Sequence, residues 1–208
     1  GDWQPYTHDE LLYTLVACFK RTPEYCRLTR VIRDIPSTDI VDGNMMTNFR
    51  QVVDHEMDRQ GATCVDIRAR EIRQQKVSAD DLVLDEIWYE TSCSDEVFIQ
   101  FITREDRKIA GFLRLSLPHK DETPISEELH DAAMIREVHV YGQALGIGAS
   151  DPGRAQHLGL GTQLIELAVE LATQRGYANL AVISAIGTRE YYRKRGFADR
   201  VLYQVRAL

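Results

Sequence analysis

The stretch Gln156-His157-Leu158-Gly159-Leu160-Gly161 limits what this chain can fold into more than any other part of the sequence. It lies between the strand-like run Ala133 to Tyr141 and the amphipathic run Thr162 to Arg175. Glycines have no β-carbon and let backbone N–H groups crowd around a diphosphate, while the helix that follows points the positive end of its dipole at the same charge. The Q-x-x-G-x-G spacing between a strand and a helix therefore indicates a cofactor that carries a pyrophosphate.

Two other structures place glycines at a similar spacing. A Rossmann site requires an acidic residue after the next parallel strand, about 20 residues further on, and the run Asn179 to Ile186 contains none. A glycine turn that serves packing alone is the other alternative. The sequence thus disfavours a dinucleotide site of the Rossmann type.

The elements around this loop predict a mixed α/β domain. Three strand-like runs separated by short polar stretches predict an antiparallel meander, over Leu82 to Thr91, Val97 to Thr103 and Lys108 to Leu117. The later elements are a strand, a helix stopped by Gly176, a strand covered on both faces, a short helix before Gly196 and a closing strand. In that order, the strand is expected at Ala133 to Tyr141, the helix at Thr162 to Arg175 and the covered strand at Asn179 to Ile186. The short helix is expected from about Thr188 and the closing strand at Val201 to Val205.

The first 61 residues predict a helix, a strand and a helix. Thr7 and Glu10 form a capping box before a helix that ends at Thr22-Pro23, and Phe49 to Met57 is amphipathic up to Gly61. The run Leu28 to Ile35 predicts a strand, but a lone strand leaves its backbone groups unpaired. Because the chain also begins at Gly1 without an initiator Met, we expect these residues to be the edge of a larger α/β domain.

Charge and composition exclude several functional classes. The 208 residues carry 25 Lys and Arg against 32 Asp and Glu, a net charge of -7, so no basic surface covers the whole protein. No apolar run approaches the roughly 18 residues that span a bilayer, and the start GDWQPYTHDE lacks a secretion signal, so we expect a cytoplasmic protein without membrane attachment. No C-x-x-C pair occurs among Cys18, Cys26, Cys64 and Cys93, which predicts reduced thiols and no metal site.

The segment Tyr191 to Phe197, Y-Y-R-K-R-G-F, lies on the expected short helix. Together with the Q-x-x-G-x-G loop it resembles the GNAT superfamily of acetyl-CoA-dependent N-acetyltransferases. The resemblance implies that the strands Ala133 to Tyr141 and Asn179 to Ile186 splay apart and that the gap accepts the pantetheine arm of acetyl-CoA. It implies cofactor contacts at Val138, His139, Val140, Gln156, His157, Leu158, Gly159, Leu160, Gly161, Thr162 and Tyr191.

Longer strings along nearly the whole chain resemble the family of Elongator catalytic subunits. These strings are Arg136-Glu137-Val138-His139-Val140-Tyr141-Gly142, Asp66-Ile67-Arg68-Ala69-Arg70-Glu71-Ile72, Arg33-Asp34-Ile35-Pro36, Ala181-Val182-Ile183-Ser184 and Gly187-Thr188-Arg189-Glu190-Tyr191-Tyr192-Arg193. That family joins a radical S-adenosylmethionine domain to a C-terminal acetyltransferase domain and modifies the wobble uridine of tRNA to a 5-carboxymethyl-type product. The resemblance implies tRNA, acetyl-CoA and other Elongator-like subunits as partners.

The resemblance divides the chain into three parts. Residues 1–61 resemble the end of the radical S-adenosylmethionine barrel, an α/β remnant; residues 62–76 form a linker; residues 77–208 form a GNAT fold, a mixed and splayed central sheet with flanking helices. The three closely spaced cysteines that hold the family's iron–sulfur cluster are absent from these residues. We therefore expect S-adenosylmethionine and the cluster to act only in a longer enzyme.

Four residues are candidates for the chemistry. A phenol near the thioester sulfur protonates the leaving thiolate of coenzyme A, and Tyr191 or Tyr192 is the candidate, with aromatic packing as the alternative. Glu137 is a candidate general base on the central strand, with pairing to a neighbouring arginine as its alternative. His139 shares the face of Glu137 and is the competing base, with a hydrogen bond to the backbone as its alternative.

Two further expectations concern the loop and the basic residues. The loop Ala144 to Ala155 is expected to cover the thioester until a substrate displaces it, unless it is an ordinary surface insertion. Clustered cations are expected to contact tRNA, foremost Arg68, Arg70, Arg73 and Lys76, unless they are solvated side chains of an acidic protein. Further clusters are Arg27, Arg30 and Arg33, and Arg189, Arg193, Lys194 and Arg195.

Two other functions stay open from the sequence. N-acetylation of a protein lysine or a small amine needs the same cofactor cleft and, in addition, a general base that faces an open acceptor groove. A binding module that holds acetyl-CoA or RNA without turnover needs no such base.

Overall fold

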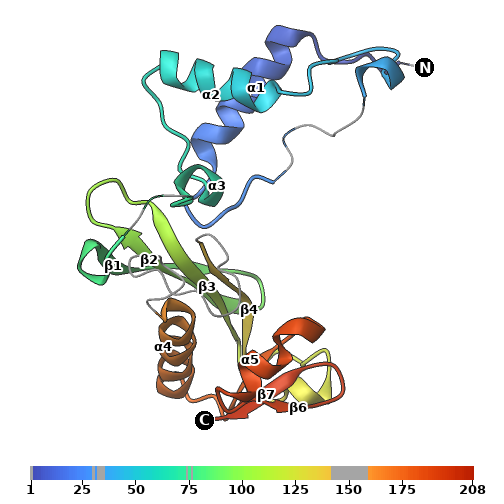
Figure 1. The fold of residues 1–208 in the computed structure, drawn as a ribbon. Coiled ribbons are helices and arrows are strands. Elements are labelled where there is room, and N and C mark those ends of the chain that lie inside the picture. Colours follow the sequence, from blue (N-terminus) through green and yellow to red (C-terminus); the bar gives the residue numbers. More distant parts are fainter. Residues whose placement is uncertain (1, 30, 32–35, 74, 76, 142–158) are drawn as a thin grey trace. The chain divides into compact units, whose positions relative to one another are not determined.

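The computed structural model describes residues 2–29, 31, 36–73, 75, 77–141 and 159–208 (Figure 1). The chain divides into two compact units, Gly1–Arg70 and Glu71–Leu208, which we describe separately. The division falls within residues 62–76, where the sequence predicts a linker.

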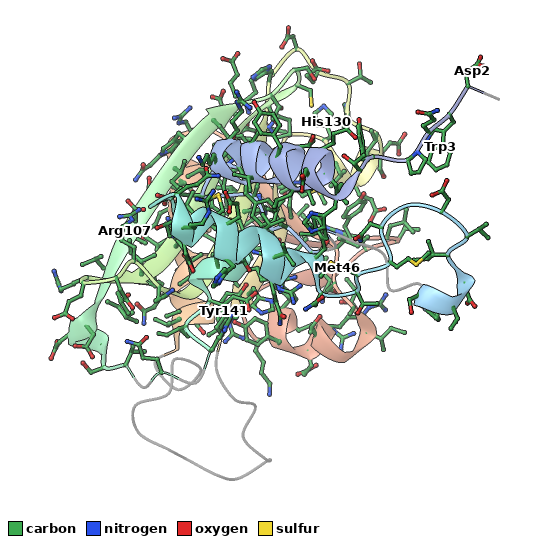
Figure 2. The ribbon with its side chains drawn as sticks, turned by 90° about the horizontal axis from the view of Figure 1, so that it is seen from above. Asp2, Trp3, Met46, Arg107, His130 and Tyr141 are labelled. Atoms are coloured by element: carbon green, nitrogen blue, oxygen red, sulfur yellow. The ribbon has the colours of Figure 1, made fainter. Side chains whose placement is uncertain are left out.

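The first unit is built on two packed helices. α1 (His8–Arg21) begins at Thr7, whose hydroxyl accepts the Glu10 amide while the Glu10 carboxylate accepts the Thr7 amide, as the capping box predicts. α2 (Phe49–Arg59) follows a short 3₁₀ turn, η1 (Ser37–Asp39). The apolar faces of both helices form one core, which contains Val16, Phe19, Phe49, Val53, Met57 and Cys64. Outside that core, Trp3 and Met46 are exposed (Figure 2).

The strand expected at Leu28 to Ile35 does not form in the part that is described. Leu28, Thr29 and Val31 are not in a strand, and residues 30 and 32–35 lie outside the described residues. The Leu28 amide donates instead to a carboxylate oxygen of Asp66, at 3.0 Å. A side chain here takes the place of the neighbouring strand that the backbone would otherwise need.

Asp66 connects several segments of the first unit. Its side chain is fully buried and also accepts hydrogen bonds from the Arg50 guanidinium, at 3.0 Å, and from the Cys64 thiol, at 3.2 Å. It lies directly before α3 (Ile67–Arg70). Residues 64–70 therefore pack as part of the first unit, although the sequence assigns them to a linker.

The second unit contains one seven-stranded sheet. Its strands run in the order β1-β2-β3-β4-β5-β7-β6, and every neighbouring pair is antiparallel except β4 and β5. The bounds are β1 (Leu82–Glu90), β2 (Ser94–Thr103), β3 (Ile109–Pro118), β4 (Ala132–Val140), β5 (Asn179–Val182), β6 (Ala198–Asp199) and β7 (Gln204–Ala207). The predicted antiparallel meander is confirmed as β1, β2 and β3.

β4 and β5 pair over only four residues, from Ala132–Asn179 to Ile135–Val182. β5 ends there, whereas β4 stays paired with β3 as far as Val140. The strand predicted up to Ile186 is therefore too long, and Ile186 is 86% exposed rather than covered. The two parallel strands part as the fold expectation requires, and no strand in the described part of the chain pairs with the β5-facing edge of β4 beyond Ile135.

One helix covers one face of the sheet. α4 (Leu160–Gln174) ends before Gly176, which has a φ of 75°, as predicted from a glycine after the last turn. Its apolar face packs on the sheet in a core that includes Leu113, Leu115, Ile135, Leu164, Ile165, Ala168, Ala172, Leu180 and Val182. The structure thus brings residues far apart in the sequence into one core beneath the parted strands.

The C-terminal residues form shorter elements than predicted. The short helix is a 3₁₀ turn, η5 (Ile186–Thr188), followed by α5 (Arg189–Arg193). The closing strand expected at Val201 to Val205 forms instead as β6 and β7, and Val201 is 85% exposed. Two further 3₁₀ turns, η2 (Ala79–Asp81) and η3 (Glu127–Leu129), precede β1 and β4.

The packing of α4 gives a prediction for stability. Leu164 is fully buried between α4 and the sheet. Leu164→Ala is expected to lower the free energy of unfolding by about 2–5 kcal/mol, because it removes buried methyl groups and leaves a cavity. Urea unfolding followed by circular dichroism measures the change. Glu170→Ala, at an exposed position of the same helix, is the control and is expected to change it by less than about 0.5 kcal/mol. Equal losses for the two variants would contradict this packing.

The cysteines give a second prediction, for chemical reactivity. Burial raises the pKa of the Cys64 thiol to about 11, whereas Cys18 and Cys93 are exposed. Because the thiolate is the nucleophile, an alkylating reagent at pH 8 is expected to label Cys18 and Cys93 and to leave Cys64 unlabelled until denaturant is added. Mass spectrometry of the digested protein reads the labelling at each site. Labelling of native Cys64 at the rate of Cys93 would show that Cys64 is accessible.

Candidate functional site

The candidate site lies where β4 and β5 part. Cross-strand pairing places Glu137 opposite Arg114 and His139 opposite Phe112, so these side chains share one face of the sheet. Val138 packs into the core on the α4 side. The predicted alternation along β4 is therefore confirmed. The main chain of residues 138–140 presents its free edge to the gap and is able to pair with an extended ligand.

α4 begins at this gap without a side-chain cap. Gly159 is the N-cap, in the left-handed conformation with a φ of 67°, and the first turn contains no acidic residue. Helix starts with free amides and no nearby carboxylate favour anions. Gln156, His157 and Leu158, which the sequence also predicts as cofactor contacts, lie outside the described residues, as does the loop Ala144 to Ala155.

Gly161 allows the closest contact of the site. A β-carbon at this position would overlap the hydroxyl of Tyr191 and lie 3.5 Å from Cγ2 of Val140. The Tyr191 hydroxyl therefore lies directly against the first turn of α4, beside β4. The sequence pattern predicts Gly161 for a phosphate approach, and the structure gives this glycine a second reason, the approach of a phenol.

The two adjacent tyrosines occupy different environments. Tyr192 is 8% exposed and packs edge-on against Phe197, with ring centroids 5.5 Å apart. Burial raises the pKa of the Tyr192 phenol. Tyr191 is only partly buried, and its ring is perpendicular to that of Tyr192. Tyr192 thus fits the packing alternative, whereas Tyr191 places its hydroxyl at the site.

Both candidate bases have partners on the sheet. A carboxylate oxygen of Glu137 accepts a hydrogen bond from Nε of Arg114, at 3.3 Å. The His139 ring is stacked on Phe112 and lies 4.4 Å from the ring of the buried Tyr141. The arginine pairing that the sequence left open for Glu137 is therefore present.

The residues predicted to contact RNA are not alike. Arg70 is 6% exposed, and its guanidinium donates to the carbonyl oxygens of Val65 and Glu24 at 2.9 Å each. Its charge is used inside the first unit, so we drop it from the proposed RNA contacts. Arg68 and Arg73 are exposed. Lys76, Arg30 and Arg33 lie outside the described residues.

Arg195 also belongs to this site, although its sequence context predicts only that it is part of a basic cluster. Its guanidinium donates to the Thr162 hydroxyl and to the carbonyl oxygen of Tyr191. Arg195 lies in the turn after α5, four residues from Tyr191, and that spacing is the sequence signal for a contact between them.

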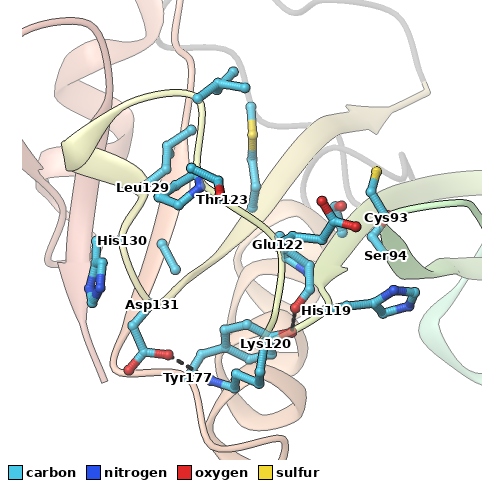
Figure 3. A pocket seen from close by; sticks show the side chains of 16 residues that line it. Cys93, Ser94, His119, Lys120, Glu122, Thr123, Leu129, His130, Asp131 and Tyr177 are labelled. Atoms are coloured by element: carbon cyan, nitrogen blue, oxygen red, sulfur yellow. Dashed lines mark hydrogen bonds and ion pairs between the residues drawn. The ribbon is translucent and has the colours of Figure 1, made fainter.

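A cavity of about 460 Å³ lies near the opposite end of β4 (Figure 3). Ala132 and Met134 line it from the start of the strand, and the segment 118–131 covers it. At its rim the Lys120 ammonium bonds to the Asp131 carboxylate, at 2.6 Å, and lies 4.0 Å from the centre of the Tyr177 ring. The free edge of β4 begins only after Ile135, so this cavity is not the gap between the strands.

Comparison with known proteins agrees with the sequence and the fold. Residues 1–59 match the model of the Radical_SAM C-terminal domain, and residues 65–197 match that of the acetyltransferase (GNAT) family. Elongator complex protein 3 of Dictyostelium discoideum is 34% identical over 203 residues, which are 95% of this chain and 36% of that protein. The tRNA uridine(34) acetyltransferase of Methanocaldococcus infernus is 33% identical over 209 residues, which are 95% of this chain and 38% of that protein.

A solved structure extends the similarity to three dimensions. The Elp3 of Methanocaldococcus infernus with its first 46 residues deleted superposes with a TM-score of 0.88 at 29% identity, covering 100% of this chain and 50% of that one. These findings confirm the predicted resemblance to the Elongator catalytic subunits and the predicted fold class. The chain spans little more than a third of the length of the curated relatives it matches. None of the described helices is long and apolar enough to cross a membrane.

The contact between Gly161 and Tyr191 gives a third prediction. Gly161→Ala is expected to lower the free energy of unfolding by about 1–3 kcal/mol, because the added methyl group overlaps the Tyr191 hydroxyl. Tyr191→Phe removes that hydroxyl, so the same glycine substitution is expected to cost less in the Tyr191→Phe background. A double-mutant cycle in urea measures the coupling.

Gly187→Ala is the matched control for this cycle. Its added β-carbon meets nothing within 4 Å, so no coupling to Tyr191→Phe is expected. If Gly161→Ala costs the same with and without the hydroxyl, the close approach of Tyr191 is not present in solution.

Proposed function

The chain belongs to the acetyltransferase (GNAT) family, and on that premise we propose that its second unit binds acetyl-CoA in the gap between β4 and β5. We further propose that it is the acetyl-CoA domain of an Elongator-like enzyme that modifies the wobble uridine of tRNA. The observation that carries the proposal is the parting of the two parallel strands beside a helix start that has no side-chain cap.

The proposed binding mode uses mainly backbone groups. The free edge of residues 138–140 pairs with the amides of the pantetheine arm, and the amides of residues 159–161 bind the diphosphate. The Thr162 amide, which the sequence also predicts as a contact, already donates to the Gly159 carbonyl oxygen, at 2.9 Å. No acidic side chain in the first turn of α4 opposes the anion. The features that would make room for the cofactor are therefore a strand edge, a helix start and glycines.

The proposed chemistry is cleavage of the thioester. The proposed nucleophile is water: it attacks the carbonyl carbon and releases a proton to solvent, the C–S bond breaks to leave a carboxylate, and Tyr191 donates its phenolic proton to the departing thiolate of coenzyme A. Tyr191 is preferred to Tyr192 because its hydroxyl lies beside β4, along which the pantetheine arm is proposed to run, whereas Tyr192 is packed in the core. We propose that tRNA stimulates this cleavage and that the acetyl group is used for a carboxymethyl-type modification at C5 of uridine.

The radical half of such a reaction is assigned to residues outside this chain. The four cysteines present are far apart in the sequence and do not form the closely spaced set that holds an iron–sulfur cluster. S-adenosylmethionine and the cluster therefore enter the proposal only for a longer enzyme. Arg68 and Arg73, with Lys76, are the proposed contacts to tRNA phosphates, and other Elongator-like subunits are proposed partners.

A second candidate function is acetylation of a protein lysine or a small amine. Glu137 and His139 share the face of β4 opposite the α4 core, where an acceptor amine would need a base. The ion pair of Glu137 with Arg114 weakens this candidate, because the carboxylate already has a partner. A module that binds acetyl-CoA or RNA without turnover is the third.

Thiol release from acetyl-CoA tests the proposal and is the fourth prediction. With the full chain, the release of coenzyme A is expected to rise when tRNA is added. Tyr191→Phe is expected to lower it on the order of 10²-fold, because the leaving thiolate loses its proton donor. Tyr192→Phe is the matched control and is expected to retain most of the activity after correction for folded protein.

The other outcomes separate the alternatives. Release that depends on peptide amines and falls with Glu137→Gln would support N-acetylation. Binding of acetyl-CoA in a calorimeter without release under either condition would support the binding module, and no binding would overturn the proposal.

A further inference from the structure

Arg195 connects α5 to the first turn of α4. Nε and Nη2 of its guanidinium donate to the Thr162 hydroxyl, at 3.2 and 2.6 Å. Thr162 is one residue from Gly161, against which the Tyr191 hydroxyl lies. The phenol reaches this turn of α4 from α5, and the arginine reaches it from the turn directly after α5.

The same guanidinium also holds Tyr191. Nη1 of Arg195 donates to the Tyr191 carbonyl oxygen at 2.7 Å, and the central carbon lies 3.4 Å from the centre of the Tyr191 ring. A planar guanidinium stacked on an aromatic face is a favourable contact. One side chain thus fixes both the backbone and the ring plane of Tyr191.

Arg195 is held without an acidic partner. Arg193 pairs with Asp199 and Glu190, and Arg206 pairs with Glu166, but none of the carboxylates in the described part of the chain pairs with Arg195. A cation near the positive end of a helix dipole is electrostatically unfavourable. The stacking on Tyr191 and the bonds to Thr162 must outweigh that repulsion, so Arg195 is more than a solvated surface charge.

A separate arginine secures the backbone of this region. Arg206 on β7 binds both carboxylate oxygens of Glu166, at 2.8 and 3.1 Å, and donates to the Arg195 carbonyl oxygen at 3.0 Å. Glu166 lies one turn after Thr162 on α4. Arg206 connects the turn after α5 to α4 without the Arg195 side chain, so loss of that side chain is expected to free the Tyr191 ring without unfolding the region.

We infer that Arg195 is a positioning residue that holds the Tyr191 hydroxyl against the first turn of α4. The catalytic consequence rests on the proposed function, because the position of the phenol matters for turnover only if acetyl-CoA binds beside it. The structural part of the inference stands on the contacts alone and is testable without turnover.

The first test uses stability. In the Arg195→Gln background the Tyr191 ring is free to move aside, so Gly161→Ala is expected to cost roughly half or less of the unfolding free energy that it costs in the unchanged protein. Arg193→Gln, on the same helix and without contact to Tyr191, is the matched control and is expected to leave that cost unchanged. An unchanged cost in the Arg195→Gln background overturns the inference, whether or not the protein binds acetyl-CoA.

The second test uses thiol release from acetyl-CoA. Arg195→Gln is expected to lower the rate at saturating acetyl-CoA about tenfold and to have little effect in the Tyr191→Phe background, because it acts through the phenol. Arg195→Lys is expected to restore little, since an ammonium cannot both stack and donate in a fork. A positioning role is overturned if Arg195→Gln lowers the rate equally in the unchanged protein and in the Tyr191→Phe variant, or if Arg195→Lys retains the full rate.

Binding separates positioning from a direct contact with phosphate. Acetyl-CoA and acetyl-pantetheine, which lacks the diphosphate, are each titrated into the unchanged protein and into the Arg195→Gln variant. For both ligands the dissociation constant is expected to differ less than threefold between the two proteins. A loss of affinity for acetyl-CoA but not for acetyl-pantetheine would show that Arg195 contacts the diphosphate and would overturn the inference. If the unchanged protein and the Tyr191→Phe variant release coenzyme A at the same rate, the proposed catalytic role of Tyr191 is wrong, even if the stability test supports the contacts of Arg195.

Discussion

Parallel pairing between β4 and β5 stops after four residues, and the second unit is organised around that interruption. On its other side β4 remains paired with β3 as far as Val140, which holds its free edge in place. α4 packs across the junction through Leu164 and Ile165 and supports both strands from one face. An unpaired edge inside a sheet is costly unless something binds there, because backbone N–H and C=O groups need partners. Among the described residues, no strand pairs with this edge of β4 beyond Ile135, which is why the proposed ligand is placed there.

Local patterns predicted much of this structure. The capping box of α1, the three strands of the meander and the glycine after α4 each follow from residues close together in the sequence, and each forms as expected. The errors share one cause. An apolar run such as Asn179 to Ile186 indicates burial, but whether it continues as a strand depends on a neighbour that periodicity does not identify. Once β5 leaves β4, Ile183 and Ile186 are exposed in spite of their composition.

Most residues of the candidate site could be predicted from the sequence, but their arrangement in space could not. The glycines and the Tyr-Tyr segment stand out in the sequence, and the resemblance connects them to one cofactor. The contact between Gly161 and Tyr191 joins residues 30 positions apart and depends on how α5 lies against α4. Which of two adjacent tyrosines faces the core is likewise decided by packing, since Tyr192 inserts beside Phe197 and leaves Tyr191 at the helix start. Arg70 shows the opposite error, a charge that looks available in the sequence and is used internally.

Asp66 in the first unit makes that unit sensitive to acid. Burial by itself would raise the pKa of Asp66, but the bonds from Cys64, the Leu28 amide and Arg50 outweigh it and hold the pKa below its ordinary value. A carboxyl with a lower pKa in the folded than in the unfolded chain stabilises the fold above its unfolded pKa, and that stabilisation is lost as the pH falls through the folded pKa. Protonation of Asp66 would weaken at the same time its bonds to the Leu28 amide, to Arg50 on α2 and to the Cys64 thiol. A single proton therefore acts on the tertiary organisation of the whole unit rather than on one local bond.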